Sequence, residues 1–124
     1  MFIVNSDSSI HITRGDIGAI KVGIKSNDGT DYTFKSGDVV RLNVHKRKHP
    51  EHVVLAKYVE VASDTTTVTI TLGRDDTKIG DIDGKPIDYW YEVELNPDTA
   101  PQTFIGYDEA GPKIFRVFPE GADE

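Results

Sequence analysis

The sequence predicts an all-β protein, built as a two-sheet antiparallel sandwich of about eight or nine strands. Residues 65–72 (TTTVTITL) alternate threonine with apolar side chains, so that Val68, Ile70 and Leu72 share one face of a strand. Segments of this kind recur along the chain, and no helical stripe of similar length competes with them. Short strands at regular spacing, joined by Gly, Asp and Asn turns, favour a sandwich. An open barrel is the structural alternative.

The N-terminal half contains four predicted strands. They cover residues 9–13, 18–25, 32–34 and 39–46. Asn27, Asp28 and Gly29 tolerate positive φ, which predicts a hairpin turn between the second and third strands.

The middle of the chain is predicted to form two strands and one short helix. Pro50 cannot donate a ladder hydrogen bond, which predicts a loop over residues 47–51. Strands are expected at 52–61 and 65–72. Residues 73–79 are expected to form one or two helical turns, because an acidic pair precedes Lys78 as the helix dipole prefers.

The C-terminal part contains three predicted strands. In the first, 87–95, the sequence puts Tyr89, Tyr91, Val93 and Leu95 on one face and Trp90, Glu92 and Glu94 on the other. Residues 102–107 and 113–118 are expected to pair as a hairpin around 108–111.

Length and composition predict one domain, residues 1–124, with a flexible N-terminus (1–7) and an acidic C-terminal tail (119–124). The net charge of −7 argues against nucleic acid and anionic membranes as partners. We expect no membrane span and no signal peptide, since no apolar run is long enough and no basic leader is present. The absence of cysteine is compatible with a reducing cytoplasm.

Two groups of residues are candidates for a metal site, although we expect no metal and no other cofactor. His45, His49 and His52 have a spacing that would suit one face of a helix. Pro50 and the strand context predict instead that they straddle a loop. Asp81 and Asp83 resemble part of a calcium loop, but the further ligands of an EF-hand are missing, and turn formation explains the same residues.

Three further features are candidates for interaction. Lys46, Arg47 and Lys48 form a basic run that fits either an acidic partner or a solvated loop tip. Trp90, with its neighbouring tyrosines, fits a stacking platform for a sugar or ordinary strand packing. The tripeptide at 14–16 (RGD) occurs in adhesion ligands, but it is also common turn chemistry.

The sequence predicts no enzyme. It contains no cysteine, no Gly-x-Ser-x-Gly elbow and no glycine-rich phosphate loop opening a helix. Carboxylates are numerous, but sequence alone places no pair across a cleft as general acid and base. We therefore expect no catalytic residues.

Several short signatures, taken in order, resemble a known group of proteins. They are residues 13–16 (TRGD), 28–29 (DG), 35–40 (KSGDVV), 75–78 (DDTK), 89–95 (YWYEVEL) and 115–121 (FRVFPEG). Their order and spacing are similar to those of small phage and prophage structural proteins of Gram-positive bacteria. More distantly, the chain resembles the N-terminal β-sandwich domain of phage baseplate upper proteins.

The resemblance implies an immunoglobulin-like sandwich that serves as a tail or baseplate assembly module, made in the bacterial cytoplasm and assembled into the virion. Its implied partners are other phage structural proteins, with a homo-oligomer as a further option. The termini and the 45–52 loop are the expected contact regions, because loop ends and sheet edges are natural assembly devices. A carbohydrate- or ligand-binding sandwich that uses Trp90 is the alternative function.

Overall fold

A computed structural model describes residues 1–25, 28–80 and 84–120. Every regular element in these residues is a strand. The strands are β1 (Phe2–Val4), β2 (Ile10–Thr13), β3 (Gly18–Val22), β4 (Val39–Lys46), β5 (His49–Glu60), β6 (Val68–Leu72), β7 (Ile87–Leu95), β8 (Gln102–Ile105) and β9 (Lys113–Phe118). The predicted all-β class is confirmed.

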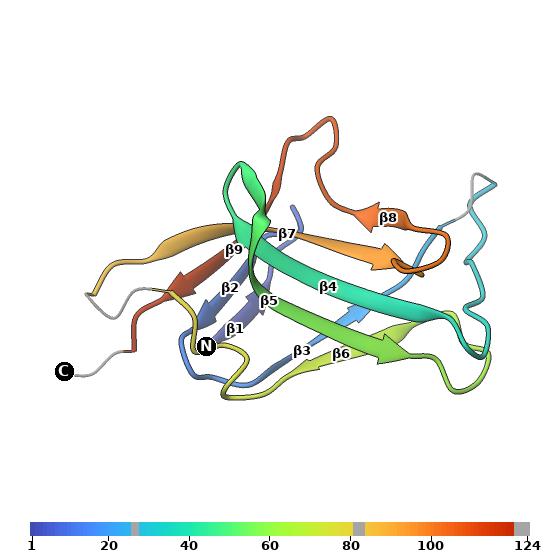
Figure 1. The fold of residues 1–124 in the computed structure, drawn as a ribbon, viewed down its shortest axis with the longest axis horizontal. Helices are drawn as coiled ribbons and strands as arrows, with labels where there is room; N and C mark the ends of the chain where they lie inside the picture. The colour runs from blue at the N-terminus through green and yellow to red at the C-terminus, as the bar shows by residue number, and fades with distance from the viewer. Residues whose placement is uncertain (26–27, 81–83, 121–124) are drawn as a thin grey trace.

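Seven strands form one large sheet in the order β1-β2-β9-β7-β4-β5, with β8 beside β7 (Figure 1). All of its ladders are antiparallel except the one between β2 and β9, which is parallel and places Ile10 opposite Phe115. The prediction of a purely antiparallel arrangement is therefore wrong at this ladder. A parallel pair needs a long connection, and about a hundred residues separate these two strands along the chain.

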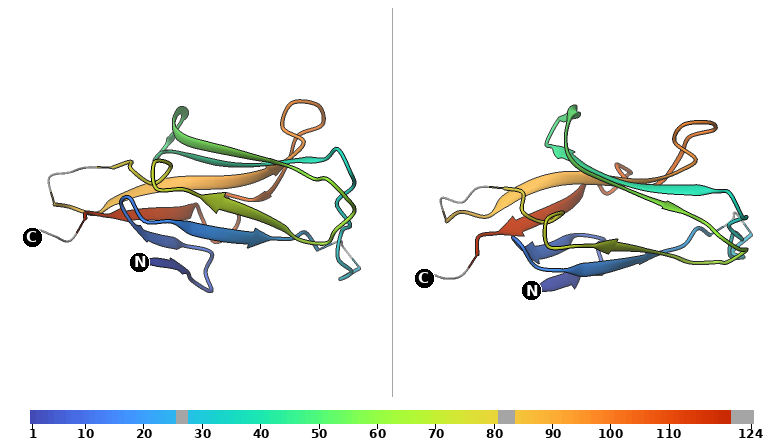
Figure 2. Two further views of the ribbon diagram at one scale, coloured as in Figure 1. Left: turned by 90° about the horizontal axis from the view of Figure 1, so that it is seen from below. Right: turned by 60° about the horizontal axis from the view of Figure 1, so that its bottom comes forward.

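β3 and β6 form a separate two-stranded antiparallel sheet. Figure 2 shows this ribbon lying against one face of the large sheet, an arrangement consistent with a β-sandwich. Within β6, Val68, Ile70 and Leu72 are buried while Thr69 and Thr71 are exposed, which confirms the predicted alternation.

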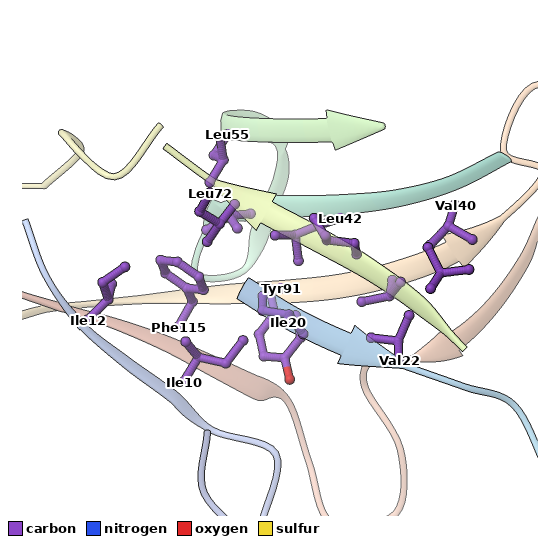
Figure 3. Packing of buried hydrophobic residues seen from close by; sticks show 14 of the residues in the cluster. Ile10, Ile12, Ile20, Val22, Val40, Leu42, Leu55, Leu72, Tyr91 and Phe115 are labelled. Carbon is purple, nitrogen blue, oxygen red and sulfur yellow. The ribbon is translucent and has the colours of Figure 1, made fainter. Parts of the chain in front are cut away.

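One apolar cluster fills the space between the two sheets (Figure 3). The small sheet contributes Ile20 and Leu72, which face Leu42 of β4 and Phe115 of β9. Phe34 is fully buried, and its backbone bridges Thr65. That bridge is the only regular pairing in the predicted strand 32–34.

The predicted hairpin between 102–107 and 113–118 is wrong. β8 and β9 both pair antiparallel with β7, β9 along residues 87–91 and β8 along residues 93–95. They therefore follow one another along the same side of β7, and residues 106–112 form an excursion between them (Figure 1). The expected turn at 108–111 is present, since Asp108 and Gly111 bridge, but it closes a local loop and does not join two paired strands.

The predicted helix at 73–79 is also wrong, and this segment forms consecutive turns. Its backbone bonds span three residues, from Asp76 N to Gly73 O and from Lys78 N to Asp75 O. The fully buried Thr77 fixes the segment, because its hydroxyl donates to the carbonyl oxygen of Asp16 at 2.6 Å. So short a segment gains too little from helical bonds to offset the cost of nucleation.

The predicted loop at 47–51 is shorter in the structure. The turn consists of Arg47 and Lys48, with Lys48 at φ 63°, and β5 begins at His49. Pro50 is tolerated because β5 is the outermost strand of the sheet, and its pairing with β4 is irregular here. At the other edge of the sheet, Phe2–Val4 pairs with β2, a strand the sequence analysis did not predict.

Candidate functional site

The face of the large sheet opposite the core carries a band of polar and aromatic side chains. It arises from the register of β4 with β7, in which Arg41 lies opposite Glu94, Asn43 opposite Glu92 and His45 opposite Trp90. Directly paired residues share a face and lie close together. The two strands therefore bring three such pairs into one continuous row.

At one end of the row, Arg41 is held by charge. Its Nε donates to Glu94 Oε1 at 3.1 Å, its Nη2 also contacts that oxygen, and its Nη1 lies 3.4 Å from the hydroxyl of Tyr58 on β5. The hydrogen bonds to Glu94 and Tyr58 raise the pKa of Arg41 above its usual value, against the effect of burial. This end of the row is a structural clamp across β5, β4 and β7.

At the other end, the row opens into a groove of about 170 Å³. The groove is lined by His45, Pro50, Trp90, Tyr91, Glu92, Tyr107, Pro112 and Lys113. Pro50 follows the β4–β5 turn and Tyr107 belongs to the 106–112 excursion, two segments that project from the same side of the molecule in Figure 1. The half-buried Trp90 and the 72% exposed Tyr107 meet with ring centroids 5.7 Å apart and planes at 60°.

Polar groups form the floor of this groove. Glu92 Oε1 lies 3.9 Å from His45 Nε2, and it accepts a hydrogen bond at 3.2 Å from Nδ2 of Asn43, a buried residue that does not itself line the groove. His45 is 4% exposed, and its Nδ1 contacts the carbonyl oxygen of Lys46 at 2.9 Å, so this nitrogen carries a proton. A hydroxyl is complementary to Nε2 whether this nitrogen donates or accepts, because a hydroxyl can do both.

A larger, shallower hollow of about 560 Å³ lies on the same face and is lined by Arg47, Pro86, Ile87, Asp88, Arg116 and Phe118. Asp88 and Arg116 are opposite each other on β7 and β9, and their two hydrogen bonds measure 2.6 and 2.9 Å. The bond to Arg116 lowers the pKa of Asp88, and Arg47 contributes further attraction. The charges of Asp88 and Arg116 are therefore paired with each other across the two strands.

The histidines of the predicted metal candidate are divided by the structure. His45 is buried on β4, whereas His49 and His52 are exposed at the start of β5, with ring centroids 5.6 Å apart and Glu51 between them. No group of three or more potential ligands occurs among the described residues. Asp81 and Asp83 lie outside the described residues.

The three interaction candidates fall in different places. Lys46, Arg47 and Lys48 are exposed at the β4–β5 turn. Trp90 lies in the groove rather than in the core. The 14–16 tripeptide forms a turn with Gly15 at φ 86°, which agrees with the interpretation as turn chemistry. Arg14 Nη1 is paired with Glu120 Oε1 at 2.6 Å.

Three residues in or beside the groove were not predicted from the sequence: Asn43, Glu92 as an acceptor, and Tyr107. The signal for the first two was the spacing of polar residues on β4 and β7, at positions 41, 43 and 45 and at 92 and 94. Tyr107 gave no signal, because its place depends on the path of an irregular loop.

The part of the chain that the structure describes contains no helix with the length and apolar character needed to cross a membrane. Comparisons with protein-family models, curated proteins and solved structures found no match to this chain.

Proposed function

We propose that this chain is a non-enzymatic structural protein of a phage or prophage virion, an assembly module associated with the tail or baseplate. It would be made in the bacterial cytoplasm and would bind other phage structural proteins, with self-association as a further option. The resemblance of the ordered signatures carries the viral part of this proposal. The missing nucleophile and phosphate motifs are the reason for proposing no catalytic role.

The observation that carries the assembly role is the pair of outermost strands of the large sheet. β1 and β5 each have a hydrogen-bonded neighbour on one side only. They also present apolar side chains to solvent, with Ile3 46% and Val4 50% exposed on β1, and Val53 49% and Tyr58 53% exposed on β5. β1 contains no charged residue, and an outermost strand of that kind invites pairing with another chain, whereas Pro50, Glu51 and Lys57 partly protect β5.

Two of the regions proposed for contact, the N-terminus and the 45–52 loop, include or adjoin these strands. β1 is the N-terminal segment, and the β4–β5 turn leads directly into β5. The exposed Lys46, Arg47 and Lys48 at that turn would add attraction toward an acidic partner, within about a Debye length. An immunoglobulin-like sandwich belongs to the same proposal. Two sheets packed face to face favour it, while the division into seven and two strands differs from the constant-type pattern.

The test is association in solution. The chain would be examined by light scattering over a wide concentration range, alone and after co-expression with the products of neighbouring genes. Ile3→Lys and Val53→Lys place a charge on each edge, and Thr71→Lys on the exposed side of β6 is the matched control. We expect complexes that the edge variants weaken and the control preserves. A strict monomer that binds none of those products would refute the assembly role.

A further inference from the structure

The groove beside Trp90 combines two features that do not serve the packing of the sandwich. One is an aromatic corner, formed by Trp90 on a strand and Tyr107 on a loop, with Tyr107 largely exposed. The other is a polar floor, in which Glu92 and the buried His45 face each other without a hydrogen bond between them. Small-molecule sites combine apolar or aromatic walls with a few placed polar groups in this way.

We propose that this groove binds one pyranose ring of a glycan. The C–H face of a sugar ring is apolar and can lie against the indole or the phenol ring, while its hydroxyls need both donors and acceptors. Glu92 Oε1 and His45 Nε2 belong to residues that line the groove and lie 3.9 Å apart, so one sugar hydroxyl beside them can donate to the carboxylate and contact the imidazole nitrogen. The proposal does not depend on main-chain pairing at an edge, because the groove lies on the outer face of the sheet, with Pro50 as its one contribution from the outermost strand β5.

The charges around the groove favour a neutral sugar. Lys113 Nζ is already paired with Asp108 Oδ2 at 2.8 Å, and its side chain is only 11% exposed, so it is a poor anchor for an anionic ligand. A cationic ligand is the remaining competitor, since aromatic rings beside a carboxylate also attract quaternary ammonium groups. Glu92, the one carboxylate among the residues that line the groove, already accepts a hydrogen bond from Asn43 and is therefore less available to a cation.

The test uses tryptophan fluorescence, because Trp90 is the chain's only tryptophan and reports on this groove alone. The probes are glucose, galactose, N-acetylglucosamine and their β-linked dimers, with choline chloride as the cationic comparison. We expect a saturable change in emission with at least one sugar, at millimolar concentrations typical of a small, open site (on the order of 1 mM).

Two variants distinguish the contribution of the aromatic wall to sugar binding from that of the polar floor. Tyr107→Ala removes an exposed wall and is expected to weaken binding about tenfold, or roughly 1.4 kcal/mol. Glu92→Gln keeps the shape but replaces a charged acceptor, and it should weaken binding by a similar factor. Tyr58→Ala, at an exposed tyrosine outside the groove, is the control and should bind as the native chain does. Thermal unfolding of each variant confirms that it is folded.

Three results would overturn the proposal. They are no response to any sugar, a response that Tyr107→Ala leaves unchanged, and a response to choline chloride alone, which would indicate a cation site. Association by light scattering is measured separately, so loss of sugar binding and loss of assembly are distinguishable.

Discussion

Individual charged pairs hold the outer face of the large sheet together. Asp88 and Arg116 are the clearest example, because they lie directly opposite on β7 and β9 and are joined by two hydrogen bonds. A paired guanidinium and carboxylate with this geometry fixes strand register as well as adding energy. The register matters here, since β9 also carries Phe115 into the core.

Asp88→Asn tests this pair through pH. The fold lowers the pKa of Asp88, mainly through its bond to Arg116, so the ionised form is favoured in the folded chain. The stabilisation is complete above the ordinary aspartate pKa of about 4 and is lost as the pH falls through the lower folded value. We expect the variant to be less stable by up to roughly 1 kcal/mol at neutral pH, since both side chains are partly exposed.

The difference between native chain and variant should shrink below about pH 4, as measured by urea unfolding at several pH values. Asp31→Asn, which removes the exposed pair with Lys25, is the control and should change little. An Asp88→Asn deficit of constant size down to pH 3 would contradict the account.

At this scale the sequence predicted which residues point outward but not what they meet. Alternation placed Trp90, Glu92 and Glu94 on one face, in agreement with the structure, because a strand's period is local. Arg41 and Glu94 are 53 positions apart in the sequence, and their pairing depends on the register between β4 and β7, which no local pattern specifies.

Strands that are unremarkable in sequence acquire their roles from neighbouring elements. β1 is three residues long, yet it covers the edge of β2 and packs its Phe2 ring on Gly18, the first residue of β3. A Cβ at Gly18 would lie 2.4 Å from Phe2 Cδ2. The glycine is therefore a site of close approach between the two sheets.

Gly18→Ala is expected to destabilise the chain by about 1–3 kcal/mol, the usual cost of an overpacked contact. Phe2→Ala removes the ring, so adding it to Gly18→Ala should recover most of the steric part in a double-mutant cycle. Lys21→Ala, at an exposed position of β3, is the control and should stay within about 0.5 kcal/mol. If chemical denaturation shows that the effects of the two substitutions are additive, then Phe2 of β1 does not pack on Gly18 of β3.

Strands were predicted well where their pattern is long and regular, as for Val39–Lys46, Ile87–Leu95 and Lys113–Phe118, whose bounds the structure reproduces. The errors at 47–51, 73–79 and 102–118 share one cause. In each case tertiary contacts decided the local structure. Pro50 is tolerated in a strand because β5 lies at the edge of the sheet. The turns at 73–79 are fixed by the hydrogen bond from the buried Thr77 hydroxyl. β8 and β9 do not pair with each other because each pairs with a different part of β7.

On the scale of the whole molecule, β9 connects the two ends of the chain. It lies between β2 and β7 in the large sheet and pairs in parallel with β2. Ile10 and Ile12, both fully buried on β2, therefore depend on a strand that follows them by about a hundred residues. Nothing in a local pattern predicts such a pairing, which explains why the topology was beyond sequence analysis while the fold class was not.

This arrangement predicts a chain that folds as one cooperative unit and only when β9 is present. Deleting residues 113–120 with all that follows should separate the β1–β2 pair from the rest of the sheet, and the product should lack the far-ultraviolet β signal and the Trp90 emission of the folded chain. For the full chain, circular dichroism and fluorescence should give coincident unfolding curves. Refolding should take milliseconds to seconds, roughly, because long-range pairing must precede most of the burial. A stable, ordered fragment ending at residue 112 would show instead that β4, β5, β6 and β7 fold independently of the chain termini, so the parallel ladder would be a late addition and not the link that completes the core.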